Sequence, residues 1–168
     1  MRDRSSSVKD DDPSNVLFDT WLTARAAIAL LDSALAGTGL DAEDFAVYSV
    51  LRQAGEISPG ELARWMSAPA TTVSSHVKRL VARGHVRQVP HPEDRRSYRI
   101  TLTDAGQHAH TTAGRHFLSA LATVEAALPR PASDVQQALR DLHAAIGAAA
   151  QRASPTESGS TRRPDLPR

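Results

Sequence analysis

The sequence contains no cysteine among its 168 residues, which excludes disulfides, cysteine-bound zinc, thiol nucleophiles and thiol redox sensors. Aromatic residues make up only 4%, so a core has to be built mostly from Ala, Leu and Val. The apolar runs are too short to cross a bilayer, and the charged N-terminus lacks the apolar segment of a secretion signal. These absences predict a helix-rich cytoplasmic protein.

Charge is nearly balanced over the whole chain, with 20 basic and 19 acidic residues. The balance is local, however, because residues 58–103 carry 8 basic and 3 acidic side chains. A segment at +5 in a protein at +1 favours binding to phosphate groups. On charge alone, a solvated basic face explains the segment equally well.

Both ends of the chain have the composition of disordered tails. Residues 1–13 contain a serine run and an aspartate run, and residues 153–168 are rich in Pro, Ser, Thr and Arg. Such segments have too little apolar surface to compensate for the entropy lost on ordering.

Between the tails, helical periodicity begins over residues 14–40, where apolar positions recur at spacings of four and three. A second helix is expected from Asp41 to Gly55. The sequence Ser58-Pro59-Gly60-Glu61 combines a capping box with proline at the first helical position, which predicts the start of a short third helix.

A fourth helix is predicted to begin at Pro69 and to end near Gly84. The period then shortens from 3.6 toward 2, which predicts two strands joined by a loop over residues 90–96. Thr103 is the expected cap of a fifth helix, and a sixth follows the prolines at 129–131.

Two helices joined by a tight turn and followed by a β-hairpin form a winged helix-turn-helix, and the basic segment coincides with it. The second helix of such a motif enters the major groove. With Val73, Val77 and Leu80 facing inward, the candidate DNA contacts on or beside its outer face are Thr71, Thr72, Ser74, Ser75, Lys78, Arg79 and Arg83. The hydroxyls suit base edges or phosphates, the cations suit phosphates, and His76 is expected to pack at the edge of the buried stripe.

The hairpin loop offers a second DNA contact. Arg95 and Arg96 are expected to reach the minor groove, with Asp94 bracing one of them through a bidentate pair. The alternative for these residues is an ordinary solvated turn.

The stretch from Asp94 to Gly106, Asp-Arg-Arg-Ser-Tyr-Arg-Ile-Thr-Leu-Thr-Asp-Ala-Gly, resembles the wing signature of the multiple antibiotic resistance regulator (MarR) family. The resemblance extends over about residues 14–152. It implies a homodimeric bacterial regulator of transcription, often a repressor released by a small ligand. The expected fold is mainly α with a small β-hairpin wing, in which a winged helix-turn-helix at 41–103 is flanked by dimerisation helices at 14–40 and 104–152.

The helical stripes outside the winged helix carry more apolar surface than that small domain covers, and pairing of two chains would bury it. The expected dimer residues are Leu17, Phe117, Leu121, Val135, Leu139, Leu142 and Ile146. A small aromatic or anionic effector is expected where these helices meet the winged helix, with Trp21 as an aromatic wall and Arg25 as an anion partner. For these two residues, a core tryptophan beside a solvated arginine is the alternative.

Neither a metal nor a cofactor is expected. His108 and His110 lie two residues apart on different helix faces, a poor spacing for zinc, and are predicted to be solvated surface histidines. No local motif supplies a nucleophile with its base, a glycine-rich phosphate loop or a metal cluster, so no enzyme is predicted.

The predicted function is therefore that of a DNA-binding transcription regulator, a homodimer on a palindromic operator in the bacterial cytoplasm at the nucleoid. A winged helix used only to bind another protein is the alternative.

Overall fold

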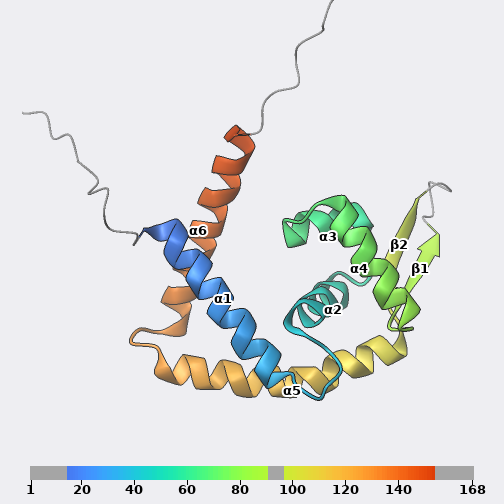
Figure 1. Cartoon of the computed structure of the whole chain (residues 1–168), viewed down its shortest axis with the longest axis horizontal. Helices are drawn as coiled ribbons and strands as arrows, with labels where there is room; N and C mark the ends of the chain where they lie inside the picture. The colour runs from blue at the N-terminus through green and yellow to red at the C-terminus, as the bar shows by residue number, and fades with distance from the viewer. Residues whose placement is uncertain (1–14, 91–96, 154–168) are drawn as a thin grey trace, which may run out of the picture. The chain divides into compact units, whose positions relative to one another are not determined.

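The computed structural model describes residues 15–90 and 97–153 (Figure 1). As predicted, these residues form six helices and one two-stranded antiparallel sheet. In chain order the elements are α1 (Val16–Ala34), α2 (Ala42–Ala54), α3 (Pro59–Met66), α4 (Ala70–Ala82), β1 (Val86–Pro90), β2 (Tyr98–Leu102), α5 (Asp104–Ala127) and α6 (Ala132–Ala153). The predicted tails at 1–13 and 154–168 lie outside the described residues, whereas Ala153 closes α6.

The chain divides into two compact units, residues 1–123 and 124–168. The first unit contains α1 to α4, the hairpin and most of α5, and the second contains the last turn of α5 and α6. No helix in the described part of the chain is long and apolar enough to span a membrane.

Local capping explains where the helices of the winged helix-turn-helix begin. Asp41 caps α2 by accepting a hydrogen bond from the backbone N–H of Asp44. Ser58 and Glu61 form the predicted reciprocal capping box, with Pro59 in the first turn of α3. These boundaries confirm the prediction made from the sequence.

Helix α3 ends at Met66, and its C-cap Ser67 has a φ of 49°, in the left-handed region. Helix α4 follows after Ala68 and Pro69. The tight turn of the helix-turn-helix is therefore confirmed. Pro69 occupies the N-cap position of α4 rather than its first helical position, and it provides no side-chain cap.

The hairpin pairs β1 with β2 in a register that places Val86 opposite Leu102. Ile57 adds a short bridge to the other edge of β2, exchanging two backbone hydrogen bonds of 3.2 and 2.8 Å with Ile100. The base of the wing is thus tied to the segment between α2 and α3.

The Leu-Thr-x-x-Gly part of the wing signature joins the hairpin to α5. The Thr103 hydroxyl donates to the carbonyl oxygen of Gly84 at 2.7 Å and accepts from the N–H of Gly106 at 3.1 Å. A Cβ at position 106 would overlap the carbonyl oxygen of His85, so only glycine fits there. The residues of this signature therefore join the end of α4 to the start of α5 through hydrogen bonds and close packing.

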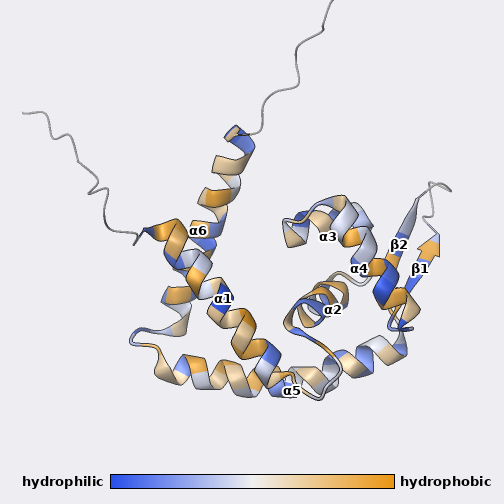
Figure 2. Ribbon diagram, viewed as in Figure 1, coloured by the Kyte–Doolittle hydropathy of each residue, from blue (hydrophilic) through white to orange (hydrophobic). Residues whose placement is uncertain are grey.

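The hydrophobic core lies in the first unit, around α2, α4 and the hairpin (Figure 2). Its fully buried members include Leu35, Val47, Tyr48, Leu62 and Ile100. Helices α1 and α6, in contrast, contain no buried residue in the described chain. Both helices therefore leave their apolar side chains in contact with solvent.

Candidate nucleic-acid interface

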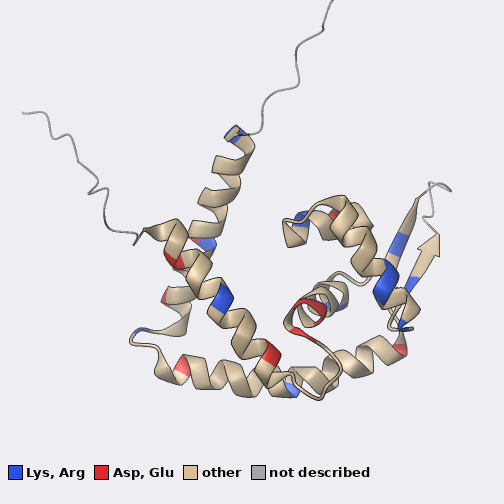
Figure 3. Ribbon diagram, viewed as in Figure 1, with Lys and Arg blue, Asp and Glu red and all other residues tan. Residues whose placement is uncertain are grey.

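The outer face of α4 presents the hydroxyl and amino groups predicted to contact DNA. Val73, Val77 and Leu80 are buried, as predicted, because they share one side of the helix. The opposite side exposes Thr71, Thr72, Ser75 and Lys78, while Ser74 is half-buried. Figure 3 shows basic residues on α4 and on both strands of the hairpin. This face combines hydrogen-bonding groups with positive charge.

The two arginines at the end of α4 bind a carboxylate of the protein itself. Arg83 Nη1 donates to Asp44 Oδ2 at 2.6 Å, and Arg79 Nη1 donates to the same oxygen at 3.2 Å. Arg79 Nη2 also lies 2.8 Å from Asp44 Oδ1, an ion-pair contact outside hydrogen-bond alignment. The side chains of Arg79 and Arg83 remain 43% and 33% exposed, whereas Asp44 is 1% exposed. Both guanidinium groups are thus positioned by α2 while part of each remains open to a phosphate.

Asp44 was not among the predicted site residues. It lies four residues before Tyr48 and seven before Leu51, on the apolar stripe of α2. A carboxylate buried among apolar residues requires a cationic partner. The position of Asp44 on the apolar stripe of α2 was therefore the signal from which a buried ion pair could have been predicted. Which cations meet the carboxylate depends on the packing of α4 against α2.

His76 is 6% exposed and completes the cluster, which confirms that it packs at the edge of the buried stripe. Its Nε2 lies 3.2 Å from Asp44 Oδ1, and its Nδ1 lies 3.1 Å from Arg79 Nη2. The ring therefore sits between the carboxylate and one of its arginines.

A second buried contact joins α2 to the start of the wing. The Tyr48 hydroxyl and His85 Nδ1 are 2.8 Å apart, and the two rings meet edge to face. Burial lowers the pKa of His85, and the positive charge of Arg83 lowers it further. Burial also raises the pKa of Tyr48. Both groups are therefore held in their neutral forms near pH 7.

The prediction of solvated histidines on α5 is confirmed for His108 but wrong for His110. His108 is exposed, whereas the His110 ring stacks on Phe45 with centroids 4.9 Å apart. Its Nε2 lies 3.0 Å from Ser49 Oγ. Burial lowers the pKa of His110, and the nearby Arg52 adds to the effect. The described residues contain no cluster of three or more potential metal ligands.

We expect His85 and His110 to make the protein less stable in mild acid. Their pKa values in the folded state lie below the ordinary value of 6.5, so the unfolded chain binds protons more readily. The free energy of unfolding is therefore highest above about pH 6.5 and falls as the pH decreases. For each histidine, the loss is about 1.4 kcal/mol for every tenfold difference in proton affinity between the unfolded and folded states.

Urea unfolding at about pH 7.5 and about pH 5.5 measures this loss. The variant His110→Gln should reduce the difference between the two pH values. The matched control His108→Gln, two residues away and exposed, should leave it unchanged. An equal reduction in both variants would contradict the assignment to His110.

The predicted wing residues Asp94, Arg95 and Arg96 lie outside the described residues. At the base of the hairpin, Arg87 is exposed on β1, and Arg99 on β2 donates to the carbonyl oxygen of Glu56 at 3.0 Å. Sequence reasoning also passed over Trp65 on α3, which is 60% exposed beside Arg64. From the sequence alone, an aromatic residue on a short amphipathic helix is taken for a core residue, unless it is known on which side of the helix it lies.

The two residues proposed to bind an effector contact each other on α1. The guanidinium carbon of Arg25 lies 5.9 Å from the centroid of the Trp21 ring, and Phe18 stacks on the same ring. Trp21 is 57% exposed, so in the single chain it is not a core residue. The guanidinium of Arg25 therefore already covers part of the Trp21 ring.

A pocket of about 520 Å³ lies between α1 and α2, lined in part by Ile28, Leu31 and Ala46. Neither Trp21 nor Arg25 lines it, and three carboxylates do, those of Asp32, Asp41 and Glu43. An anionic effector would be repelled there.

The predicted dimer residues differ in how much they are already covered. Leu17, Leu139 and Ile146 are exposed by 61%, 52% and 37%. Phe117 instead packs against the core, with its ring 5.0 Å from that of Phe45. The remaining members, Leu121, Val135 and Leu142, are half-buried. Much apolar surface on α1 and α6 therefore has no cover in the described chain.

Comparison with known proteins finds similarity over part of the chain. Residues 38–97 match the model of the MarR family. The transcriptional activatory protein BadR of Rhodopseudomonas palustris is 28% identical over 109 residues, covering 63% of this chain and 62% of BadR. The chain spans between 48% and 62% of the length of the first curated relatives it matches.

The fold is shared with solved regulators. The M. tuberculosis transcriptional regulator MOSR, solved in complex with DNA, superposes with a TM-score of 0.72 at 25% identity, covering 81% of this chain and 98% of MOSR. PcaV of Streptomyces coelicolor, solved with its natural ligand, gives a TM-score of 0.68 at 22% identity, covering 82% of this chain and 94% of PcaV. The winged helix-turn-helix architecture is therefore confirmed.

Proposed function

We propose that the chain is a transcription regulator of the MarR family, whose model matches residues 38–97, and that it binds specific double-stranded DNA sequences. The observation that carries the proposal is the exposed face of α4, with Thr71, Thr72, Ser75 and Lys78, on a helix-turn-helix whose inner face is buried. A helix presented in this way fits the major groove. MOSR, which has the same fold, was solved with DNA.

Within this interface we assign different roles to the hydroxyl and the cationic side chains. Thr71 and Ser75 would contact base edges, because they lie on the outer face in the first turns of α4. Lys78, with Arg79 and Arg83 held by Asp44, would neutralise phosphates. Arg95 and Arg96, braced by Asp94, would extend the contact into the minor groove.

We further propose that the protein acts as a homodimer. The uncovered apolar side chains of α1 and α6 support pairing, and two copies of α4 would then read half-sites about one helical turn apart. Residues 14–40 and 104–152 would serve dimerisation and residues 41–103 DNA binding. Such a protein would work in the bacterial cytoplasm at the nucleoid, and no catalytic activity is assigned to it.

Regulation by a small ligand is part of the proposal. PcaV, a transcriptional regulator of similar fold, was solved with its natural ligand, and BadR is named as a transcriptional activatory protein. For this chain we propose repression relieved by an aromatic or anionic effector at Trp21 and Arg25. The effector would have to displace Arg25 from the face of the ring.

DNA binding is tested by titrating purified protein into labelled DNA from beside its own gene and reading fluorescence anisotropy. Specific binding should survive an excess of unrelated competitor DNA. Binding that the competitor removes completely would contradict sequence-specific recognition.

The variant Lys78→Gln should weaken binding to all DNA sequences alike. It should also flatten the plot of log affinity against log salt by about one for each protomer, since one phosphate contact is lost. Ser75→Ala should instead change the preference among half-site variants. Arg115→Gln, an exposed charge change on α5, is the matched control and should leave the salt slope unchanged. An unchanged slope in Lys78→Gln would remove Lys78 from the interface.

A further inference from the structure

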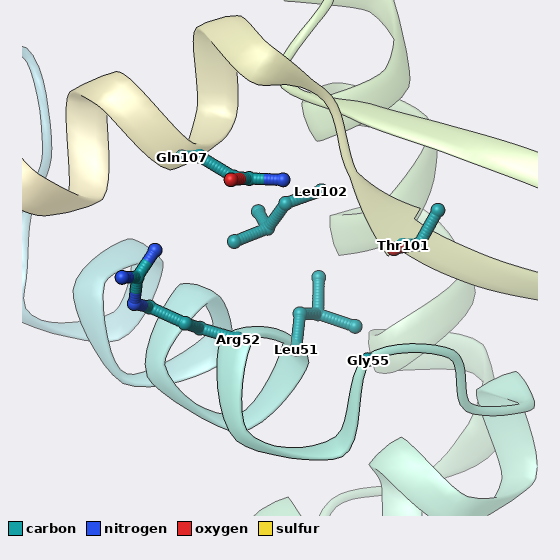
Figure 4. Close-up of a pocket in the computed structure, with 6 residues that line it drawn as sticks. All are labelled: Leu51, Arg52, Gly55, Thr101, Leu102 and Gln107. Atoms are coloured by element: carbon teal, nitrogen blue, oxygen red, sulfur yellow. The ribbon is translucent and has the colours of Figure 1, made fainter.

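A pocket of about 250 Å³ opens where the end of α2, the strand β2 and the first turn of α5 meet (Figure 4). Its lining residues are Leu51, Arg52, Gly55, Thr101, Leu102 and Gln107. Figure 4 shows the side chains of Leu51 and Arg52 extending from α2 toward those of Leu102 and Gln107. None of the lining residues belongs to α4 or to the Trp21–Arg25 pair.

The chemistry of this lining is that of an anion site with an apolar floor. Leu51 and Leu102 are core residues, 1% and 5% exposed, and they present the edge of the core to the pocket. Arg52 brings a guanidinium for which the described residues provide no ion pair or hydrogen bond, and no acidic side chain lines the pocket. Gln107 and Thr101 add an amide and a hydroxyl. A planar guanidinium fork beside further donors matches a carboxylate.

We propose that this pocket binds a short aliphatic monocarboxylate, with its carboxylate on Arg52 and Gln107 and its carbon chain on Leu51 and Leu102. One cation matches one negative charge. The volume is below the roughly 300–1,000 Å³ of sites for drug-sized molecules. The lining contains no aromatic ring on which a planar ligand could stack, so a branched aliphatic chain is the better match to the leucines.

A carboxylate at this site would connect the wing to the helix that positions the recognition arginines. Thr101 belongs to β2, which pairs with β1, while Arg52 and Asp44 are both on α2. A ligand that binds one arrangement of β2 and α2 better than another must change DNA affinity by the same factor as DNA changes ligand affinity. This coupling rests on the proposed function, whereas binding of the carboxylate does not.

The test uses the full-length chain and sodium isovalerate, with binding measured by calorimetry. We expect a dissociation constant on the order of 1 mM and, for the neutral isostere isovaleramide, binding at least about tenfold weaker. Arg52→Gln should weaken isovalerate binding by about tenfold or more, and Gln107→Leu should weaken it less. Arg115→Gln on α5 removes an exposed charge outside the pocket and should bind as the wild type does. Arg25→Gln on α1 tests the competing site for an anion beside Trp21.

His110 provides an independent readout by NMR. Arg52 contributes to the lowered pKa of His110, so a carboxylate that neutralises Arg52 should raise that pKa. The rise should be absent in Arg52→Gln. If thermal melting shows that Arg52→Gln does not fold, the comparison of isovalerate with isovaleramide and the pKa of His110 in the wild type decide the matter.

Three results would overturn the inference. The first is that the wild type does not bind isovalerate at about 10 mM. The second is that Arg115→Gln loses as much isovalerate affinity as Arg52→Gln, which indicates diffuse charge attraction. The third is that only Arg25→Gln loses isovalerate affinity, which places the ligand on α1. Each can occur while the wild type binds DNA normally. Conversely, failure to bind DNA would refute the proposed function and leave the calorimetry unaffected.

Discussion

Replacing Leu139 and Leu142 together with aspartate should convert the proposed homodimer into monomers and weaken operator binding by at least about 100-fold, because the second half-site is then no longer bound intramolecularly. Leu139 is 52% exposed, and α6 has no buried residue in the described chain. Leu139 and Leu142 lie on the apolar stripe of that helix, where a dimer would bury them. Carboxylates there would have to be desolvated without partners, which opposes association.

Light scattering at micromolar concentration, combined with DNA titration, measures both effects. The charge-matched control is Gln136→Asp with His143→Asp, which changes exposed positions one residue away from the apolar stripe. The control should remain dimeric and should bind the operator as the wild type does. A wild-type protein that is monomeric at this concentration would refute the dimer.

The secondary structure around the interface could be predicted because its signals are local. Ser58 and Glu61 are three residues apart, and Thr103 reaches the N–H of Gly106 within one turn. The side of α4 that faces the core could also be predicted, since a rotation of about 100° per residue places Val73 and Val77 opposite Ser75. These features depend on neighbours in sequence, so periodicity and capping rules suffice for them.

The contacts that shape the candidate site are long-range, and periodicity does not specify them. Asp44 meets Arg79 and Arg83 across 35 and 39 residues, and His110 meets Ser49 across 61. The sequence therefore predicted Arg79 and Arg83 as cations available to phosphate but not the carboxylate that holds them. In the same way, His110 was read as a surface residue because its stacking partner is on another helix.

Replacing Asp44 with asparagine should cause a large loss of folding stability. Removing one partner of a buried ion pair costs about 3–5 kcal/mol when both partners are buried. Here Arg79 and Arg83 are 43% and 33% exposed and can regain water, so for Asp44→Asn we expect a loss of about 2–3 kcal/mol in the free energy of unfolding. His76, at 6% exposure, would lose its anionic neighbour without gaining solvent.

The adjacent acidic residue is the matched control. Glu43 is 56% exposed and lies 3.8 Å from His76, so Glu43→Gln removes the same charge from the same turn of α2 but should cost less than about 0.5 kcal/mol. Urea unfolding at pH 7 compares the two variants. Equal losses would show that Asp44 acts only through the general charge of α2.

DNA binding by Asp44→Asn should be measured at a temperature where the variant remains folded. This measurement distinguishes a role of Asp44 in stabilising the fold from a role in positioning Arg79 and Arg83. In the wild type, Asp44 would hold Arg79 and Arg83 in the orientation that suits the operator phosphates. Without it, both arginines can move to pair with phosphates of any sequence. Binding to unrelated DNA should then depend more steeply on salt, by about one for each arginine that gains a phosphate. The ratio of specific to unrelated affinity should fall, because the gain does not depend on bases. An unchanged ratio and slope would mean that Asp44 stabilises the fold without positioning the interface.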